Sequence, residues 1–422
     1  MINSKQNFFT KNIFSNLYVL IPIALITGPF IPDLIFVIIC LYFLINFKNF
    51  RNDEIFNYKF HYFFILFYIS ICFSSIISEY NLYSIKSSFF YIRFGLFSLA
   101  TYFLILNDRK CLLSITKIFL IIYLILLIDS FFQYLFGFNL FGWTFEGHKF
   151  YVTSFFGEDE VLGSYVARLF PFVLSLLIFS KEELNFKFNN ILIFFIFASA
   201  SLITLISGER TSMALLLLSI FIMFLTCHKL RKLIVICYLT IILTITLIVL
   251  SSDITKERMY NQTINQLGLS GESERLVVFS KTYESHYLIA LKMFKQKPIL
   301  GYGPKTFRKF CAEPENYVNE IACTTHPHNI LMQLLSETGI IGTSFYFFIF
   351  IFLAVILFKI SIKGIFFNDK SQKDYITLIF IFYFINLFPL APSGNFFNNW
   401  LSMIYYLPLG YFFYLLKYKQ KT

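Results

Sequence analysis

Long apolar stretches recur along almost the whole chain and alternate with short polar stretches. A helix of roughly 20 residues crosses a hydrocarbon core of about 30 Å, and most of these stretches approach that length. We expect about twelve spans, near residues 14–30, 32–47, 60–78, 84–106, 112–136, 161–180, 191–206, 211–227, 233–250, 339–358, 375–391 and 398–416. The pattern predicts an all-α polytopic integral membrane protein with residues 1–422 in one membrane domain. Pro22 interrupts the first run, so we expect no cleavable signal peptide.

The polar segment 251–338 is the longest interruption of this pattern. Ser270 is a plausible helix cap, and a helix from there to about Gln296 would be amphipathic and lie on the membrane surface. Pro298 and the Gly301–Pro304 turn would end that helix. We expect the segment to form a lid with amphipathic helices over the membrane domain.

Composition and charge fix the class and the orientation. The chain is 57% hydrophobic and 14% charged, which excludes a soluble protein. A net charge of +11 is compatible with an anionic polymer as partner, but the cations concentrate in one alternate set of short loops. That distribution predicts orientation instead, with both termini cytoplasmic, segment 251–338 in the periplasm and no nucleic-acid partner. We expect a multi-pass protein of the bacterial inner membrane.

Two cysteines, Cys311 and Cys323, fall in the outer segment. An oxidising compartment permits a disulfide between them, and two isolated thiols are the alternative. The other five fall in spans or at cytoplasmic edges.

The stretch from Thr324 to Asn329 places two histidines where the polar segment re-enters the membrane. Proline is tolerated in a first helical turn, so Pro327 predicts a helix from near Thr325 through Gly339 to about Phe358. That helix would be longer than the hydrocarbon core is thick, which places His328 at its outer lip.

The spacing of His328-Asn329, nine residues, Gly339, two residues and Gly342 resembles the signature of the O-antigen ligase family. These are membrane enzymes that attach a lipid-carried polysaccharide to lipid A core. Further similar stretches are Ser207–Thr211, Arg275–Phe279, Pro298–Pro304 and Thr153–Gly157. The specific part of the resemblance covers about 150–345. Glu158-Asp159-Glu160 departs from the family, many members of which have an asparagine-containing stretch there.

The resemblance implies a glycosyltransferase that moves a glycan from undecaprenyl diphosphate to an acceptor sugar hydroxyl of lipid A core. Such a reaction needs a base for the hydroxyl and positive charge for the departing diphosphate. A neutral imidazole suits His328 to the first role, and guanidinium groups suit Arg210 and Arg275 to the second. His326 and Asn329 are candidates for substrate binding beside them. A histidine in this place is otherwise a packing residue, and an arginine a solvated or snorkelling one.

Arg93 and Arg168 lie inside apolar runs, where an unpaired charge is costly and marks a cavity or an ion pair. We expect them either to bind the lipid diphosphate along its path or to pair with an acid such as Asp129.

Alternatives to this function remain open. A repeat-unit polymerase of O-antigen or exopolysaccharide would use the same donor, a protein O-oligosaccharyltransferase a protein acceptor, and a transporter would move a small solute across the membrane. Some lipid-linked sugar transferases hold a divalent metal on acidic pairs near the first outer loop. Glu158 and Glu160 are the nearest match here and lie in a different loop, so we predict an enzyme without metal or other cofactor.

Overall fold

A computed structural model describes residues 2–144, 151–266, 279–366 and 372–421. Over these residues the chain is helical, and only two isolated β-bridges join extended segments. This confirms the all-α class that the apolar periodicity predicts.

The helices are joined mostly by short connections. Their bounds are α1 (Ile2–Ala24), α2 (Phe30–Ile45), α3 (Lys59–Ile76), α4 (Asn81–Phe89), α5 (Ile92–Asn107), α6 (Lys110–Phe136), α7 (Leu162–Glu183), α8 (Asn190–Ile206), α9 (Arg210–Thr226), α10 (Arg231–Ser251), α11 (Asp253–Lys256), α12 (Gln262–Gln266), α13 (Lys281–Gln296), α14 (Phe307–Phe310), α15 (Ile330–Phe366), α16 (Asp374–Asn386), α17 (Asn399–Tyr406) and α18 (Leu409–Lys421). Short 3-10 turns are η1 (Leu25–Thr27), η2 (Phe47–Asn49), η3 (Glu54–Asn57), η4 (Ser154–Phe156) and η6 (Pro314–Asn316), and a π-helical turn is η5 (Glu257–Asn261).

Among the described residues, six helical segments are long and apolar enough to cross a membrane, judged by length and composition. They are Lys59–Ile76, Asn81–Asn107, Lys110–Phe136, Leu162–Glu183, Arg231–Ser251 and Ile330–Ile365. Five shorter apolar helices accompany them, at Ile13–Thr27, Phe30–Ile45, Asn190–Ile206, Arg210–Thr226 and Asp374–Asn386. The membrane class is therefore supported, while the expected number of twelve spans is not confirmed.

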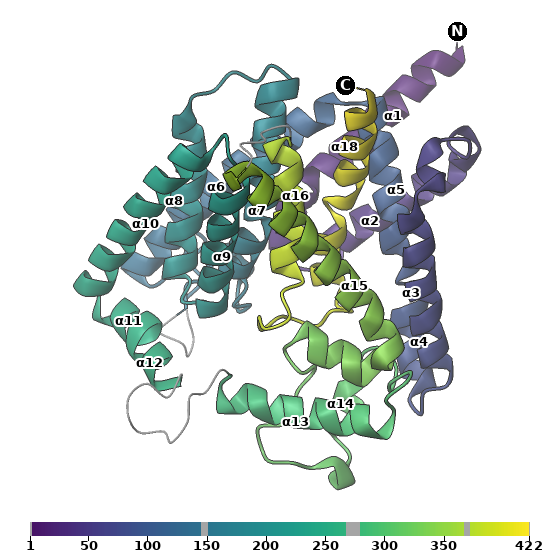
Figure 1. Ribbon diagram of the computed structural model, residues 1–422, viewed down its shortest axis with the longest axis vertical. Helices are drawn as coiled ribbons and strands as arrows, with labels where there is room; N and C mark the ends of the chain where they lie inside the picture. The colour runs from purple at the N-terminus through teal and green to yellow at the C-terminus, as the bar shows by residue number, and fades with distance from the viewer. Residues whose placement is uncertain (1, 145–150, 267–278, 367–371, 422) are drawn as a thin grey trace.

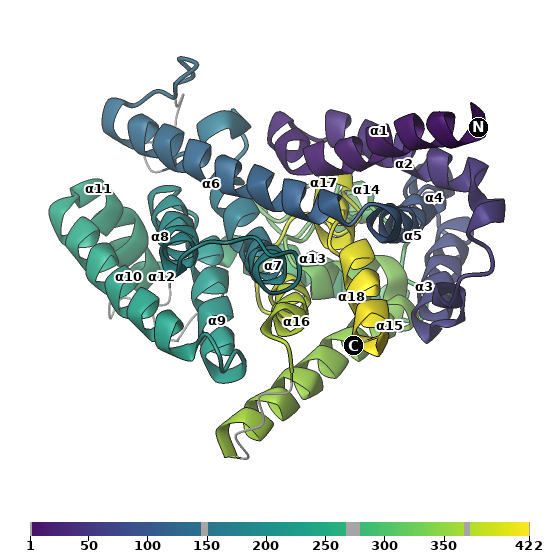
Figure 2. The ribbon, with the colours of Figure 1, turned by 90° about the horizontal axis from the view of Figure 1, so that it is seen from above.

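Helix α7 forms the centre of the bundle, between α6, α8, α9 and α16 (Figure 2). It is buried over almost its whole length, whereas only 22% of the apolar stretch of α3 and 17% of that of α10 is buried inside the protein, as for helices that face lipid. Both chain ends lie at one side of the molecule, and α13 and α14 lie at the opposite side (Figure 1). Cytoplasmic termini and a periplasmic 251–338 segment stay predictions, because the arrangement does not say which side faces the cytoplasm.

The helix expected to run unbroken from Thr325 through Gly339 is different in the structure. It begins at Ile330, and Gly339 interrupts it with φ 60° and ψ −164°. The segment 298–303 fits into this break: Ile340 N donates to Pro298 O at 2.8 Å, and Gly303 N donates to Glu337 O at 2.7 Å. A β-carbon on Gly339 would lie less than 3.0 Å from main-chain atoms of this segment, so the two backbones touch where a side chain cannot fit.

Helix α13 also starts later than the sequence suggests. Ser280 is its N-cap, with the Ser280 hydroxyl accepting a hydrogen bond from Tyr283 N at 3.4 Å. Ser270, the cap expected from the sequence, lies outside the described residues. Its buried face, which includes His286, Ile289 and Met293, packs against α15. The amphipathic pattern is therefore satisfied at least partly by protein, and a resting place on the membrane surface stays a prediction.

A disulfide joins Cys311 and Cys323, which confirms the bridge that the sequence left open. It closes the segment immediately before the two histidines. The remaining five cysteines are free.

Candidate active site

A cavity of about 680 Å³ lies between α7, α9, α13 and the segment 388–394. Four of the predicted site residues line it: His326, His328, Arg210 and Arg168. These side chains come from three separate parts of the chain, and the fold brings them to one place.

The backbone around His328 is held by the distant segment 389–393. Ser393 N donates to His328 O at 2.9 Å, and a β-bridge joins Asn329 to Pro392. His328 itself adopts φ 53°, a left-handed conformation that is uncommon outside glycine and often marks a functional site. The chain therefore turns sharply at His328 instead of entering a helix there.

Asn329 explains why the helix starts after the histidines. Its Oδ1 accepts a hydrogen bond from Met332 N at 3.1 Å, which caps α15, and its Nδ2 donates to Pro389 O at 2.8 Å. The side chain is buried and does not line the cavity. Asn329 thus fixes the histidine turn, and direct binding of substrate by Asn329 stays a prediction.

Three histidine rings and a tyrosine ring form a compact group. The ring centroids of His328 lie 4.0 Å from His326, 5.5 Å from His286 and 5.8 Å from Tyr283. Burial and, to a smaller extent, the charge of the neighbouring His286 together lower the pKa of His328 to about 4. Burial likewise lowers the pKa of His326 to about 3, with His328 adding to the effect. Both imidazoles are therefore neutral at pH 7.

The two cavity histidines differ in their hydrogen bonds. His326 uses both ring nitrogens: Nδ1 contacts the Thr325 hydroxyl at 2.8 Å, and Nε2 contacts Ser393 O at 3.3 Å. Within the described parts of the chain, the ring of His328 makes no hydrogen bond, so its acceptor nitrogen is available to a ligand. His326 has the geometry of a support and His328 that of a base.

Arg210 stands at the start of α9, directly after a tightly bonded turn. The Glu209 carboxylate accepts hydrogen bonds from Gly163 N, from Ser164 N at 2.9 Å and from the Ser212 hydroxyl at 2.8 Å. Burial raises the pKa of Glu209 to about 7, although these hydrogen bonds lower it. Arg210 is half-buried and, within the described residues, forms no hydrogen bond or ion pair. The turn thus presents to the cavity a guanidinium that, in the described structure, no carboxylate contacts directly, although Glu160 and Glu209 also line the cavity.

Arg168 is almost fully buried on α7 but is not ion-paired in the described structure. Its Nε donates to the Ser164 hydroxyl at 3.0 Å, and its Nη1 donates to Asn386 Oδ1 at 3.1 Å. Asp129, the suggested acid, instead accepts hydrogen bonds from Leu140 N and from the Ser154 hydroxyl. Neutral polar groups hold Arg168 at the cavity wall, and its charge acts on the nearby Glu209 carboxylate.

A third arginine of the cavity, Arg258, was not singled out from the sequence. It comes from the π-helical turn η5, donates to Gly208 O at 3.2 Å and to the Tyr151 hydroxyl, and covers the Tyr151 ring at 4.3 Å. π-Helical turns occur often at functional sites. The charges of Arg210 and Arg258 both act on Tyr283, lowering a pKa that burial raises. In the sequence, the abundance of cations in 251–338 was a signal, but nothing distinguished Arg258 from its neighbours.

Two predicted residues are not part of this cavity. Arg93 forms an ion pair with Asp33 at 3.0 Å and does not line the cavity. Of the two roles expected for it, the structure thus shows ion pairing, with Asp33 as the acid in place of Asp129. Arg275 lies outside the described residues. Its role stays a prediction.

No three His, Cys, Asp or Glu side chains in the described parts of the chain come together in a way that could hold a metal ion. Independence from metal remains a prediction for experiment.

Comparison with known proteins adds one finding to this geometry. No curated protein matches the chain. A family model described as O-Antigen ligase matches residues 192–347. The matched segment contains Arg210, Arg258 and both cavity histidines, and it agrees with the resemblance carried by the His328 to Gly342 spacing. Residues 192–347 of this membrane protein belong to the O-antigen ligase family.

Proposed function

We propose that the protein transfers a glycan from undecaprenyl diphosphate to a sugar hydroxyl of lipid A core at the periplasmic face of the inner membrane. One observation carries the proposal: the unpaired guanidinium of Arg210 and the neutral ring of His328 line the same cavity within the matched family segment. A cation for the leaving group and a base for the nucleophile are the two parts that such a transfer needs.

The acceptor oxygen forms a bond to the anomeric carbon of the donor glycan while the bond from that carbon to the diphosphate oxygen breaks. The hydroxyl proton passes to His328, and the electron pair leaves with the diphosphate. Arg210, with Arg258 and Arg168 nearby, stabilises the charge that develops there, and Arg275 is a further candidate for this role.

Three arginines, Arg168, Arg210 and Arg258, and two acids, Glu160 and Glu209, line the cavity. The arginines outnumber the acids, and an anionic ligand would balance the excess positive charge. The proposed donor supplies such an anion in its diphosphate. Binding of the donor would also favour the protonated form of His328, because an adjacent negative charge raises the pKa of an imidazole. The donor would thereby improve His328 as an acceptor of the hydroxyl proton.

The test uses Arg210→Ala and His328→Ala, with Arg51→Ala as the matched control, because Arg51 is exposed and lies away from the cavity. In cells and with purified protein, the two site variants should lose glycan attachment by about 100-fold or more, and the control should keep it. Intact lipid-linked polymer should accumulate, visible as uncapped core on a gel of surface polysaccharide.

Other outcomes distinguish the competing functions. If the site variants leave only single repeat units, the protein is a repeat-unit polymerase. If both folded variants attach glycan as the wild type does, the transferase proposal is wrong, and uptake of a small solute is the next activity to measure.

A further inference from the structure

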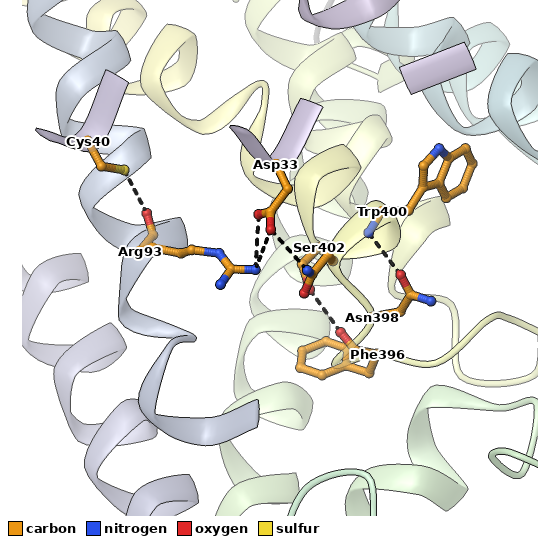
Figure 3. Close-up of polar contacts among 8 residues, drawn as sticks. Asp33, Cys40, Arg93, Phe396, Asn398, Trp400 and Ser402 are labelled. Carbon is orange, nitrogen blue, oxygen red and sulfur yellow. Dashed lines mark hydrogen bonds and ion pairs between the residues drawn. The ribbon is translucent and has the colours of Figure 1, made fainter. Parts of the chain in front are cut away.

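A second group of charged side chains lies beside the histidines but outside the cavity that contains Arg210. Its first part is the ion pair between Arg93 Nη2 and Asp33 Oδ1 at 3.0 Å (Figure 3). Asn399 Nδ2 donates to the same carboxylate at 3.1 Å. The pair is partly open, because 19% of the Arg93 side chain and 24% of the Asp33 side chain are exposed. Within this part of the group, one positive and one negative charge cancel.

The second part of the group is not balanced in this way. The carboxylate of buried Glu337 accepts hydrogen bonds from two main-chain amides, Lys305 N at 2.9 Å and Phe307 N at 3.1 Å, and from the Gln333 amide at 2.9 Å. These bonds bind the backbone of the loop and leave the ammonium of Lys305 free. In the described part of the structure, neither that ammonium nor the Arg308 guanidinium has a hydrogen-bond or ion-pair partner.

Both free cations are partly withdrawn from water. Arg308 Nε is buried without a partner, and so is Arg93 Nε in the adjacent pair. Burial lowers the pKa of Lys305, the charges of Glu337 and Asp33 raise it, and those of Arg308 and Arg93 lower it. Lys305 also adopts φ 64°, a left-handed conformation that the bonds to Glu337 maintain. The group thus holds three cations, Lys305, Arg308 and Arg93, beside two carboxylates, Glu337 and Asp33. The remaining positive charge is partly buried, which is unfavourable unless an anion binds there.

The position of this group relates it to the proposed chemistry. The charge of Arg308 acts on His326 and lowers its pKa. His326 in turn lines the cavity and lies 4.0 Å from His328, measured between ring centroids. The group is therefore a neighbour of the proposed base, and it is separate from the arginines proposed to bind the donor diphosphate.

We propose that Lys305 and Arg308 bind an anionic group, a phosphate or carboxylate, of the acceptor glycan and thereby bring the attacking hydroxyl to His328. The inference rests on the proposed transferase function and adds the charge class of the acceptor. Lys305 and Arg308 would select a negatively charged sugar over a neutral one. Only a charged sugar can replace the water that the two cations have lost through burial.

The test compares Arg308→Gln and Lys305→Gln with Lys309→Gln. Lys309 is the matched control because it follows Arg308 directly, is exposed, and covers the Tyr83 ring at 5.2 Å. Purified variants are assayed with two acceptors, the anionic glycan and the same glycan after its phosphate or carboxylate groups are removed or blocked. We expect the apparent KM for the anionic acceptor to rise about tenfold to a hundredfold, as for a lost charged hydrogen bond. The KM for the neutral acceptor, the KM for the donor and the control should stay unchanged.

Three results would overturn the inference. An equal loss with both acceptors would mean that Arg308 only positions His326. A raised KM for the donor would assign the cations to the diphosphate, and a loss that anionic phospholipid alone restores would assign them to lipid headgroups. An Arg308→Lys variant keeps the charge and should recover the anionic acceptor, which separates the effect from misfolding. Failure of the transferase proposal would look different, because the wild type would then transfer glycan to neither acceptor.

Discussion

Gly339 offers the sharpest test of how the fold builds this site. The substitution Gly339→Ala adds one methyl group at a point where the chain has φ 60° and ψ −164°, a region essentially restricted to glycine. That methyl carbon would lie less than 3.0 Å from the main chain at Ile299 and Leu300, which cannot rotate away as a side chain can.

The cost can be estimated from this geometry. The backbone conformation costs about 1–3 kcal/mol in any residue but glycine. Main-chain bonds between 298–303 and 336–341 have lengths of 2.7 to 3.2 Å, and losing two of them costs about 2 kcal/mol. Alanine also lowers the conformational entropy of the unfolded chain, which stabilises the folded state by about 0.4–1 kcal/mol. We expect Gly339→Ala to lower the free energy of unfolding by about 2–4 kcal/mol.

Gly28→Ala is the matched control. Gly28 has φ 98° and ψ −171°, in the same region as Gly339, but a β-carbon there meets no atom within 4 Å, so this variant carries the conformational cost without the clash. Its net cost should be about 1–2 kcal/mol. Unfolding of both variants is measured by circular dichroism as the mole fraction of SDS in mixed micelles rises. If the two variants unfold at the same mole fraction, close approach of the backbones is not the reason for glycine at position 339.

Further predictions concern the disulfide, the dependence of kcat/KM on acidic pH, the role of Arg258 and the need for metal. Replacing Cys311 and Cys323 by serine should lower the free energy of unfolding by about 2–3 kcal/mol. In calorimetry or SDS unfolding, the double variant should behave like the reduced wild type, and a stability equal to that of the oxidised wild type would contradict this. Because burial lowers the pKa of His328 to about 4, its imidazole stays neutral and able to accept a proton as pH falls through 6.5. In a Glu209→Gln, Glu337→Gln background, which removes two carboxyl groups that would otherwise titrate near neutral pH, kcat/KM should stay flat down to about pH 5, and a midpoint at 6.5 would contradict this. Arg258→Lys keeps the charge but loses the forked contacts of the guanidinium, so we expect it to reduce transfer about as much as Arg258→Gln does. A much smaller loss in Arg258→Lys would mean that only the charge is needed. Transfer in excess chelator should equal transfer without it, and loss that is restored by magnesium or manganese would overturn metal independence.

The sequence predicted which residues meet better than it predicted the local backbone. Helical class, membrane character and the disulfide option were accessible because apolar run lengths and cysteine positions are local properties. The meeting of His326, His328 and Arg210 was implied only by the family resemblance. Arg258 was not accessible, because its contribution depends on a π-helical turn that directs it toward Gly208 and Tyr151. Such a turn leaves no clear pattern in the sequence.

The wrong helix start shows where local rules fail. Pro327 is compatible with a first helical turn, and the apolar residues after Gly339 continue a helical pattern, so local preference favours one long helix. Hydrogen bonds from segments distant in sequence decide otherwise. Ser393 and the Asn329 cap fix the turn at His328, while 298–303 occupies the break at Gly339. Neither partner is predictable without the tertiary fold.

The division of the cavity between two parts of the chain has a consequence for specificity. The proposed base and the arginine proposed for the leaving group lie within the matched segment 192–347, whereas Arg168 and the wall 388–394 lie outside it. That wall also holds the histidine turn, through Ser393 N and His328 O at 2.9 Å. A change in the wall therefore alters both the shape offered to the glycan and the position of the proposed base. For this reason we expect substitutions in 388–394 that keep the main-chain bond to His328 to change which glycan is accepted, and those that break it to lower turnover for every glycan.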